Sequence, residues 1–256
     1  MSMPPTRGIR TFRYAVFFDG IDDYAVIEPF TVYGWPEITI QEWIYFYHPK
    51  DINVFSHPSS LGDGWSGEPM IDHYSPYFSA YPYKYVRFWG CREKGTCTDY
   101  QYNIIKYVNQ WINVVRRFDS TRNISYFVNG VREYSNTIPS DYKTVLEWNP
   151  DTATRPALYR RFVLGMGTYL VTPMKMLQSN LLIYSKAPSE SELRHNMAYP
   201  WNPVGDGLKV WLLARPDYIK DIDGDGVLEW IDLSGNNNHA KLYGATLATP
   251  IKTPLR

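Results

Sequence analysis

The chain has 256 residues, of which 26 are basic and 26 acidic, and its formal net charge is +0. No run of Lys or Arg dominates, so the sequence lacks the basic patch that is typical of a protein that binds nucleic acid or an anionic membrane. Aromatic residues make up 16% of the chain, with 22 Tyr and 9 Trp, and this composition favours strands and flat contact surfaces.

The N-terminal residues carry no targeting signal that we recognise. Residues 1–10 contain two prolines but no apolar core, so no secretory signal peptide is predicted. No apolar stretch reaches membrane-spanning length, and we expect no membrane insertion. We therefore expect a protein that becomes part of a particle, virion or surface by assembly, or that otherwise stays in the cytoplasm.

Period-two alternation of apolar residues recurs along the chain and predicts strands. Asn129-Gly130 is a strong hairpin signal between two of these runs. Ser189 with Glu192 forms a capping box, so one short helix is expected near residues 189–197. Many short strands with almost no helix predict an all-β fold, a two-sheet antiparallel β-sandwich. The clearest runs are residues 38–47, 85–89, 112–118, 124–128, 131–134, 181–184 and 208–213.

The composition divides the chain into four parts. Residues 1–11 form an N-terminal tail, residues 12–198 the sandwich, and residues 199–207, rich in Pro and Gly, a joint. Residues 208–256 add a strand and an acidic loop, and they are too few to bury a core alone. We expect this last segment to complete the same sandwich or that of a neighbouring molecule.

The two cysteines, Cys91 and Cys97, flank a predicted hairpin tip at residues 92–96. Cysteines that face each other across a hairpin can form a disulfide. The lack of a signal peptide favours two reduced thiols instead, so both alternatives stay open.

The acidic loop has the spacing of a twelve-residue calcium loop. Carboxylates stand at loop positions 1, 3, 5 and 12, and Gly226 at position 6 permits the sharp turn that lets a backbone oxygen join them. An Asp at position 12, where an EF-hand has Glu, resembles the loops of dockerin repeats. The alternative is an Asp/Gly-rich turn without a metal. The predicted Ca2+ ligands are Asp221, Asp223, Asp225, Asp232 and the backbone oxygen of Val227.

Four stretches together resemble the laminin-G-like jelly rolls of the concanavalin A-like lectin and glucanase superfamily. The resemblance runs from about Phe17 to Met197 and implies two antiparallel sheets packed face to face, one of them concave. The stretches are Phe18-Asp19-Gly20-Ile21-Asp22-Asp23-Tyr24, similar to FDGxDDY; residues 38–44, similar to FTIEAWV; residues 111–130, similar to WHHVA…LYVNG; and residues 182–193, similar to VRIYNRALSxxEI.

The C-terminal segment also resembles this family, but at an unexpected place in the chain. In the family, a GLVLWL…DLSGNGNHGxLYGA stretch usually precedes FDGxDDY, whereas here residues 207–245 follow the closing strand. Either the fold is circularly permuted, or this segment pairs with another subunit by strand exchange.

The same resemblance suggests a second cation site, because family members often bind calcium near sheet edges. The residues concerned are Asp19, Asp22 and Asp23. The alternative is a turn in which these carboxylates hold backbone N–H groups.

The superfamily includes glucanases, whose acid/base pair resembles E-x-D-x-x-E on a single strand. In this sequence no Glu is followed two residues later by Asp. The five histidines show no paired metal spacing and no neighbouring nucleophile motif. We therefore predict that the chain is not an enzyme, with a glycoside hydrolase as a distant alternative.

A glycan-binding site needs aromatic faces for sugar rings and polar groups for hydroxyls. Residues 55–80 are predicted to form a long loop, and the richest supply of such groups lies in the stretch from Trp65 to Tyr85. The alternative is that this loop merely packs over the sandwich. The candidate glycan-binding residues are Trp65, Asp72, His73, Tyr74 and Tyr77.

These observations predict a non-enzymatic, lectin-like β-sandwich that binds calcium and acts in adhesion or assembly. One hypothesis is a module that binds a glycan or a surface receptor. The other is a structural protein that builds or decorates a particle, such as a capsid or spike of an archaeal virus, without binding glycans. The missing signal peptide favours the second, because virions of many viruses assemble inside the cell. The C-terminal extension also resembles proteins of hyperthermophilic archaea and their viruses. Self-association or contact with other particle subunits is expected, and a nucleic-acid partner is not.

Overall fold

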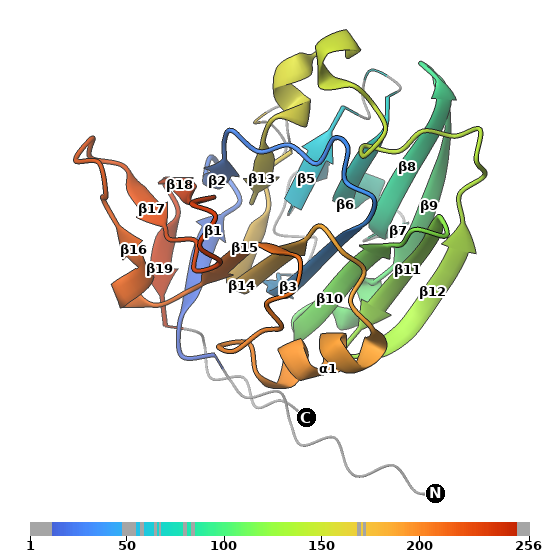
Figure 1. Ribbon diagram of the computed structural model, residues 1–256. Helices are drawn as coiled ribbons and strands as arrows, with labels where there is room; N and C mark the ends of the chain where they lie inside the picture. The colour runs from blue at the N-terminus through green and yellow to red at the C-terminus, as the bar shows by residue number, and fades with distance from the viewer. Residues whose placement is uncertain are drawn as a thin grey trace, which may run out of the picture.

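The computed structural model describes residues 12–47, 55–56, 59–63, 66, 68–78, 81–82, 85–167, 170 and 173–249, with backbone alone at 55–56, 73–78 and 81–82. Two antiparallel sheets lie face to face, and the main hydrophobic core fills the space between them (Figure 1). The described part of the chain contains one α-helix, α1 (Glu190–Ala198). The predicted all-β, two-sheet antiparallel sandwich with one short helix is confirmed.

The first sheet follows the order β12-β11-β10-β3-β14-β1-β19, and β15 pairs with β14 beside β1. Its strands are β1 (Ala15–Asp19), β3 (Ile38–Phe46), β10 (Trp111–Phe118), β11 (Asn123–Val128), β12 (Val131–Thr137), β14 (Lys175–Tyr184), β15 (Leu208–Leu213) and β19 (Thr246–Ala248).

The second sheet follows the order β16-β17-β18-β2-β13-β5-β6-β8-β9, and β4 and β7 also pair with β6. Single turns of 3-10 helix lie at Ile105–Tyr107, Pro150–Thr152, Pro156–Tyr159 and Pro216–Tyr218. The strands are β2 (Tyr24–Ile27), β4 (Phe55–Ser56), β5 (Ser59–Gly62), β6 (Met70–Phe78), β7 (Tyr81–Pro82), β8 (Tyr85–Glu93), β9 (Thr96–Asn103), β13 (Phe162–Leu164), β16 (Ile219–Lys220), β17 (Leu228–Trp230) and β18 (Ala240–Tyr243).

Local sequence signals explain several of these elements. Alternation in β3 sends Ile40 and Ile44 into the main core, while Trp43 packs on the opposite face with Leu182. Asn129 and Gly130, both with positive φ (51° and 77°), form the predicted hairpin turn between β11 and β12.

Helix α1 begins at the predicted capping box. The side chain of Ser189 accepts a hydrogen bond from the N–H of Glu192, and the Glu192 carboxylate accepts one from the N–H of Ser189. The helix packs against the outer face of the first sheet, where Leu193 contacts Val115 and Phe127. No helix in the described part of the chain is long and apolar enough to cross a membrane.

The C-terminal segment pairs with strands of its own chain in this structure. Strand β15 runs antiparallel to β14, β18 to β2, and β19 to β1. The side chain of Trp230, on β17, is fully buried in the main core. Residues 208–248 are thus part of both sheets of the sandwich.

A polar network crosses the core and joins the two sheets. The buried side chains of Glu42 (1% exposed) and Arg116 (0% exposed) form an ion pair of 2.7 Å between Oε2 and Nη2. Ser59 of the second sheet donates to Glu42 (3.1 Å) and accepts from Arg116 (2.8 Å). Gln178 donates to the other oxygen of Glu42 at 3.2 Å. The charges of Glu42 and Arg116 are tolerated in this core because they pair with each other, although Nε and Nη1 of Arg116 are buried without a hydrogen-bond partner among the described residues.

Candidate functional site

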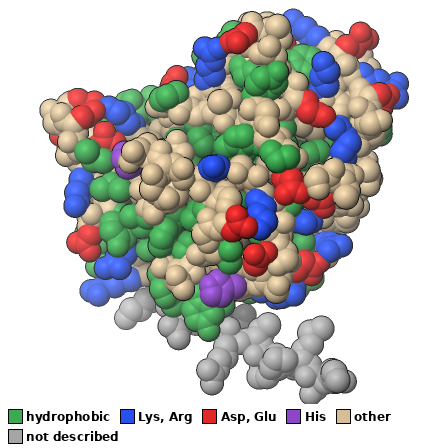
Figure 2. Space-filling view, in the orientation of Figure 1, with side chains coloured by type: hydrophobic (Ala, Val, Ile, Leu, Met, Phe, Trp, Pro, Cys, Tyr) green, Lys and Arg blue, Asp and Glu red, His purple; other side chains and the backbone are tan. Residues whose placement is uncertain are grey.

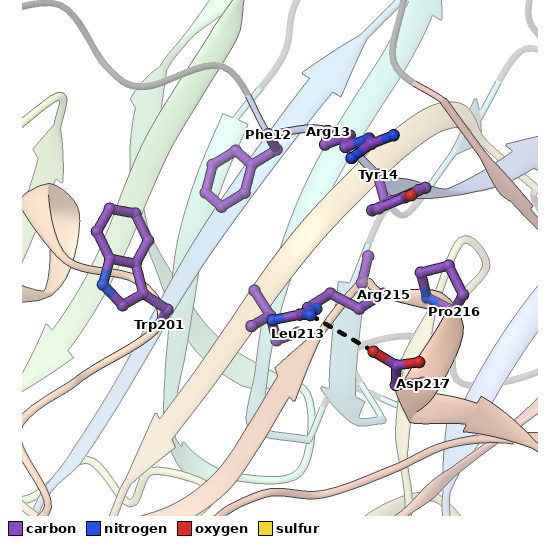
Figure 3. A pocket seen from close by; sticks show the side chains of 9 residues that line it. Phe12, Arg13, Tyr14, Trp201, Leu213, Arg215, Pro216 and Asp217 are labelled. Atoms are coloured by element: carbon purple, nitrogen blue, oxygen red, sulfur yellow. Dashed lines mark hydrogen bonds and ion pairs between the residues drawn. The ribbon is translucent and has the colours of Figure 1, made fainter.

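A cavity of about 480 Å³ opens where the N-terminal segment, the joint and the end of β15 meet. Three rings, two guanidinium groups and one carboxylate lie around it (Figure 3). Hydrophobic side chains also gather on the lower left part of the molecular surface in this region (Figure 2). The lining residues are Phe12, Arg13, Tyr14, Trp201, Leu213, Ala214, Arg215, Pro216 and Asp217.

The floor of the cavity is built by the end of β15. Leu213 (7% exposed) and Ala214 (4% exposed) are buried there. The N–H of Ala214 donates to the carbonyl of Ser179 at 2.9 Å, which fixes the end of β15 against β14. Pro216, whose ring favours the first position of a helical turn, then starts a 3-10 turn.

The joint is held against the sheet by buried polar side chains. The amide of Asn180 donates to the carbonyl of Pro200 at 2.9 Å, and the N–H of Val204 donates to Asn196 at 2.9 Å. Both Asn side chains are fully buried. These bonds place Trp201, which follows Pro200, at the rim of the cavity.

Two aromatic side chains, Phe12 and Trp201, line one side of the cavity. Trp201 is 43% exposed, and its ring meets that of Tyr199 edge-on at 6.1 Å between centroids. Phe12 packs against Trp43 and Trp111, each at 6.1 Å. In Figure 3, Trp201 and Phe12 lie on the side of the cavity away from Arg215 and Asp217. The indole thus offers a flat apolar surface beside the cavity.

The opposite side of the cavity is charged. Arg215 and Asp217 form an exposed ion pair of 3.4 Å, and Arg13 stacks over the ring of Tyr14 at 5.5 Å. Two arginines and one aspartate give the lining a net charge of +1. An exposed pair of this kind is weak, so its hydrogen-bonding groups remain accessible to a ligand.

The acidic loop brings three of its predicted ligands together. Carboxylate oxygens of Asp221, Asp223 and Asp225 lie within 4.8 Å of one another. Lys241 of β18 places its Nζ 3.0 Å from Asp223 and 2.6 Å from Asp225. The hydrogen bonds from Lys241 and from the N–H of Val227 lower the pKa of Asp225, and these carboxylates raise the pKa of Lys241. An ammonium group thus neutralises part of the cluster.

The structure does not bring Asp232 to this cluster. Its carboxylate is buried and accepts the N–H groups of Trp211 (2.8 Å), Ser234 (2.9 Å) and Asn238 (3.0 Å), so it organises the turn after β17. Glu229 lies nearer the loop and accepts the N–H of Ile222 at 2.8 Å. At Val227, the described contact is its N–H, which donates to Asp225 at 2.8 Å.

The second predicted acidic group, near the N-terminus, holds a turn. Carboxylate oxygens of Asp19, Asp22 and Asp23 lie within 4.8 Å of one another. Asp23 accepts the N–H of Asp19 at 2.8 Å, and Asp19 accepts the N–H of Ile21 at 2.7 Å. Burial raises the pKa of Asp23, as do the neighbouring charges of Asp19 and Asp22. These contacts match the turn alternative for this motif.

The prediction of a long loop over residues 55–80 is wrong, because the described part of this stretch forms strands β4, β5 and β6. The candidate glycan-binding residues predicted there are only partly described. Trp65 lies outside the described residues, and His73, Tyr74 and Tyr77 are described as backbone of β6 alone. Asp72 is fully buried, and its two oxygens accept from Nε and Nη2 of Arg87 at 2.6 and 2.7 Å. This carboxylate is therefore part of an internal ion pair between β6 and β8.

Cys91 and Cys97 form a disulfide in the structure. They are directly paired residues of the β8–β9 hairpin. The bond therefore joins the two strands close to the hairpin tip.

Sequence reasoning missed the cavity and the position of Lys241. The segment Pro200-Trp201-Asn202-Pro203 could have indicated the cavity, because a Trp close to two prolines is held on a stiff backbone where its ring can form a contact surface.

Comparison with known proteins gives relatives of the fold. A crystal structure of a Bacteroides ovatus protein, provisionally described as carbohydrate-binding, aligns with 95% of this chain and 61% of its own chain, with a TM-score of 0.64 and 16% identity. This chain thus spans less than two thirds of that protein.

Two further solved structures align less closely. The heptameric SAP-like pentraxin of Limulus polyphemus covers 72% of this chain and 82% of its own, with a TM-score of 0.48 and 10% identity. The binding domain of botulinum neurotoxin serotype D covers 71% of this chain and 41% of its own, with a TM-score of 0.46 and 11% identity. No protein-family model and no curated protein matches the sequence. The fold of this chain, a two-sheet antiparallel β-sandwich, is similar to that of the Bacteroides ovatus protein.

Proposed function

We propose that this chain is a carbohydrate-binding module and that the cavity beside Trp201 is its glycan site. The observation that carries the proposal is the combination of an exposed indole with guanidinium and carboxylate groups around one cavity. A sugar ring has an apolar face that stacks on an aromatic ring, while its hydroxyl groups need hydrogen-bonding partners at the edge. The fold shared with the Bacteroides ovatus protein supports the same proposal.

The charge of the cavity favours sugars that carry a carboxylate. Arg215 is paired with Asp217, whereas Arg13 has a ring as its described partner, which leaves one positive charge uncompensated. A guanidinium group forms two parallel hydrogen bonds with a carboxylate, which adds geometric specificity. We therefore propose that uronic acids or other acidic sugars bind better than neutral ones.

A glycan array tests this proposal. Wild-type protein is expected to bind a defined set of glycans enriched in acidic sugars, and Trp201→Ala is expected to lose that binding. Leu228→Ala is the control, because Leu228 on β17 is exposed to a similar extent (45%) and does not line the cavity. An array on which wild type and W201A give the same pattern would contradict the proposal.

We propose that the site binds glycans without cleaving them. Hydrolysis by the usual mechanism needs two carboxyl groups on either side of the glycosidic bond. The described residues that line the cavity include a single carboxylate, Asp217. Asp72, the carboxylate predicted for a glycan site, is fully buried against Arg87. Release of reducing ends from a bound glycan would contradict this part.

We also propose that the acidic loop binds Ca2+ through Asp221, Asp223 and Asp225. Hard carboxylate oxygens are the donors that Ca2+ prefers, and three of them converge here. Lys241 lies at the cluster as a competing cation, so binding requires its side chain to move away. The arrangement of Asp232 supports a site with fewer protein ligands than the sequence motif predicts.

We further propose that the fold is a circularly permuted laminin-G-like jelly roll. Support comes from the pairing of the C-terminal strands β15, β18 and β19 with β14, β2 and β1 of the same chain. Assembly into a particle stays a prediction, and analytical ultracentrifugation of the purified protein over a range of concentrations tests it.

A further inference from the structure

A second cavity, of about 510 Å³, lies at a different part of the sandwich. One wall is the loop that follows β2, and the other contains the turns around residues 149–160. In Figure 1 these turns are the yellow coils at the top, whereas α1 and the joint lie at the bottom. The lining residues are Pro29, Phe30, Thr31, Tyr33, Asn149, Pro150, Asp151 and Arg160, none of which lines the first cavity.

The two walls are held in place by backbone hydrogen bonds. The N–H of Phe30 donates to the carbonyl of Arg160 at 2.7 Å, and that of Gly34 donates to Leu146 at 2.8 Å. Phe30 is 5% exposed and packs edge-on against Trp35 at 5.8 Å and Phe162 at 6.3 Å. The cavity therefore has a rigid apolar base that is continuous with the core.

An aromatic ring stands exposed at this rigid base. Tyr33 is 46% exposed, and the hydroxyl group at the end of its ring has no partner among the described residues. An exposed Tyr on an ordered loop offers an apolar face together with a polar edge. These are the two features that a sugar ring needs from a stacking partner.

Free hydrogen-bonding groups surround the cavity. Thr31 accepts the N–H of Tyr33 at 3.2 Å, which leaves its own O–H free as a donor. Asn149 accepts the N–H of Asp151 at 2.9 Å, and its amide NH2 has no partner in the described part of the chain. These groups can bond the hydroxyls of a bound sugar.

The charges of this second cavity cancel. Asp151 and Arg160 form an ion pair with each other, so the lining has one positive and one negative charge. The first cavity, in contrast, has a net charge of +1. The second cavity therefore lacks the unpaired cation that would select an acidic ligand.

We propose that the second cavity is an independent carbohydrate-binding site for an uncharged sugar unit, which makes this chain bivalent for glycans. It does not depend on the first site, because the two share no lining residue. Two sites on one chain allow it to bridge two glycan strands, or to hold one strand at two points with increased avidity.

The test uses neutral monosaccharide probes and the full chain. Methyl α-glucoside, methyl α-mannoside and methyl β-galactoside are titrated separately into isotope-labelled protein, and backbone amide shifts are followed by NMR. At least one probe is expected to shift the amides of Thr31, Tyr33 and Asp151 in a saturable way. Trp201→Ala is expected to leave these shifts unchanged.

Variants of Tyr33 complete the test. Tyr33→Ala is expected to weaken the binding that these amides report by about tenfold. Tyr33→Phe keeps the ring and is expected to retain most of the binding, and Tyr199→Ala is the control for an exposed aromatic elsewhere. The proposal is overturned if no probe gives saturable shifts at these amides, or if the shifts persist unchanged in Y33A. Loss of glycan binding in W201A alone would affect the first site and leave this one standing.

Discussion

The buried ion pair between Glu42 and Arg116 provides a sharp test of how the two sheets are held together. Arg116 is fully buried, and its Nη2 donates to Glu42 and to Ser59 at 2.7 and 2.8 Å. Replacement of Arg116 by Met keeps a long apolar side chain but removes the cation. Glu42, a buried carboxylate, then loses the countercharge that Arg116 supplies.

The expected loss in the free energy of unfolding follows from the remaining contacts. Removal of one partner of a buried pair costs about 3 to 5 kcal/mol. Glu42 keeps the hydrogen bonds from Ser59 and Gln178, so we expect the lower end, about 3 kcal/mol. This is a large share of the roughly 5 to 15 kcal/mol that stabilises a typical domain.

Urea unfolding followed by tryptophan fluorescence and by circular dichroism measures this loss. The double variant Glu42→Leu with Arg116→Met removes both charges, and we expect it to lose clearly less stability than the two single variants added together. Lys94→Met, at the exposed tip of the β8–β9 hairpin, is the control for removal of an unburied charge. A loss below about 1 kcal/mol in R116M, or strict additivity in the double variant, would refute the role given to this pair.

Two further predictions concern titrating and metal-binding groups. Lys241→Met removes the cation that competes with Ca2+ at the acidic loop, so calorimetry should show a Kd for Ca2+ roughly two to five times lower than in wild type. Asp223→Asn removes one of the three carboxylates and should abolish Ca2+ binding. An unchanged Kd in K241M would contradict the competition between Lys241 and Ca2+. Burial raises the pKa of Asp99 from its ordinary value of 3.8 to about 6. The positive charge of Arg87 opposes this rise, and the negative charge of Asp72 adds to it. Because the folded state holds the proton of Asp99 more tightly than the unfolded state does, protonated Asp99 adds to the free energy of unfolding at low pH. This contribution is lost as the pH rises through about 6, and Asp99→Asn should remove this pH dependence. A carboxyl titration with a midpoint near 4 in carbon NMR would contradict this shift.

Elements that depend on short stretches of the chain could be predicted from the sequence alone. The alternation of β3, the Asn129-Gly130 turn and the Ser189 capping box each involve neighbours a few residues away. The exception on the buried face of β3 is Glu42, whose partner Arg116 lies far along the chain. Local patterns therefore predict the strands but not the ion pair between them.

The candidate sites show the same limit. Asp221, Asp223 and Asp225 are brought together by their own short loop, as their spacing predicts. Asp232 fits the same spacing but accepts N–H groups from β15 and the following turn, which only the tertiary structure reveals.

The proposed glycan cavity draws its residues from both ends of the chain, residues 12–14 and 201–217, and no single stretch of sequence contains its pattern. Phe12, Trp201 and Arg215 meet only because β15 pairs with β14 beside β1. The position of the C-terminal segment in the sandwich therefore decides where the proposed ligand binds.

The central claim is that Trp201 and its cavity bind a glycan, and the most direct measurement is calorimetry with the strongest glycan from the array. We expect Trp201→Ala to weaken binding by at least about tenfold through the loss of its stacking surface, and Leu228→Ala, which changes an exposed side chain outside the cavity, to bind as wild type does. Equal affinities for wild type and W201A, with the variant folded, would contradict the proposed site.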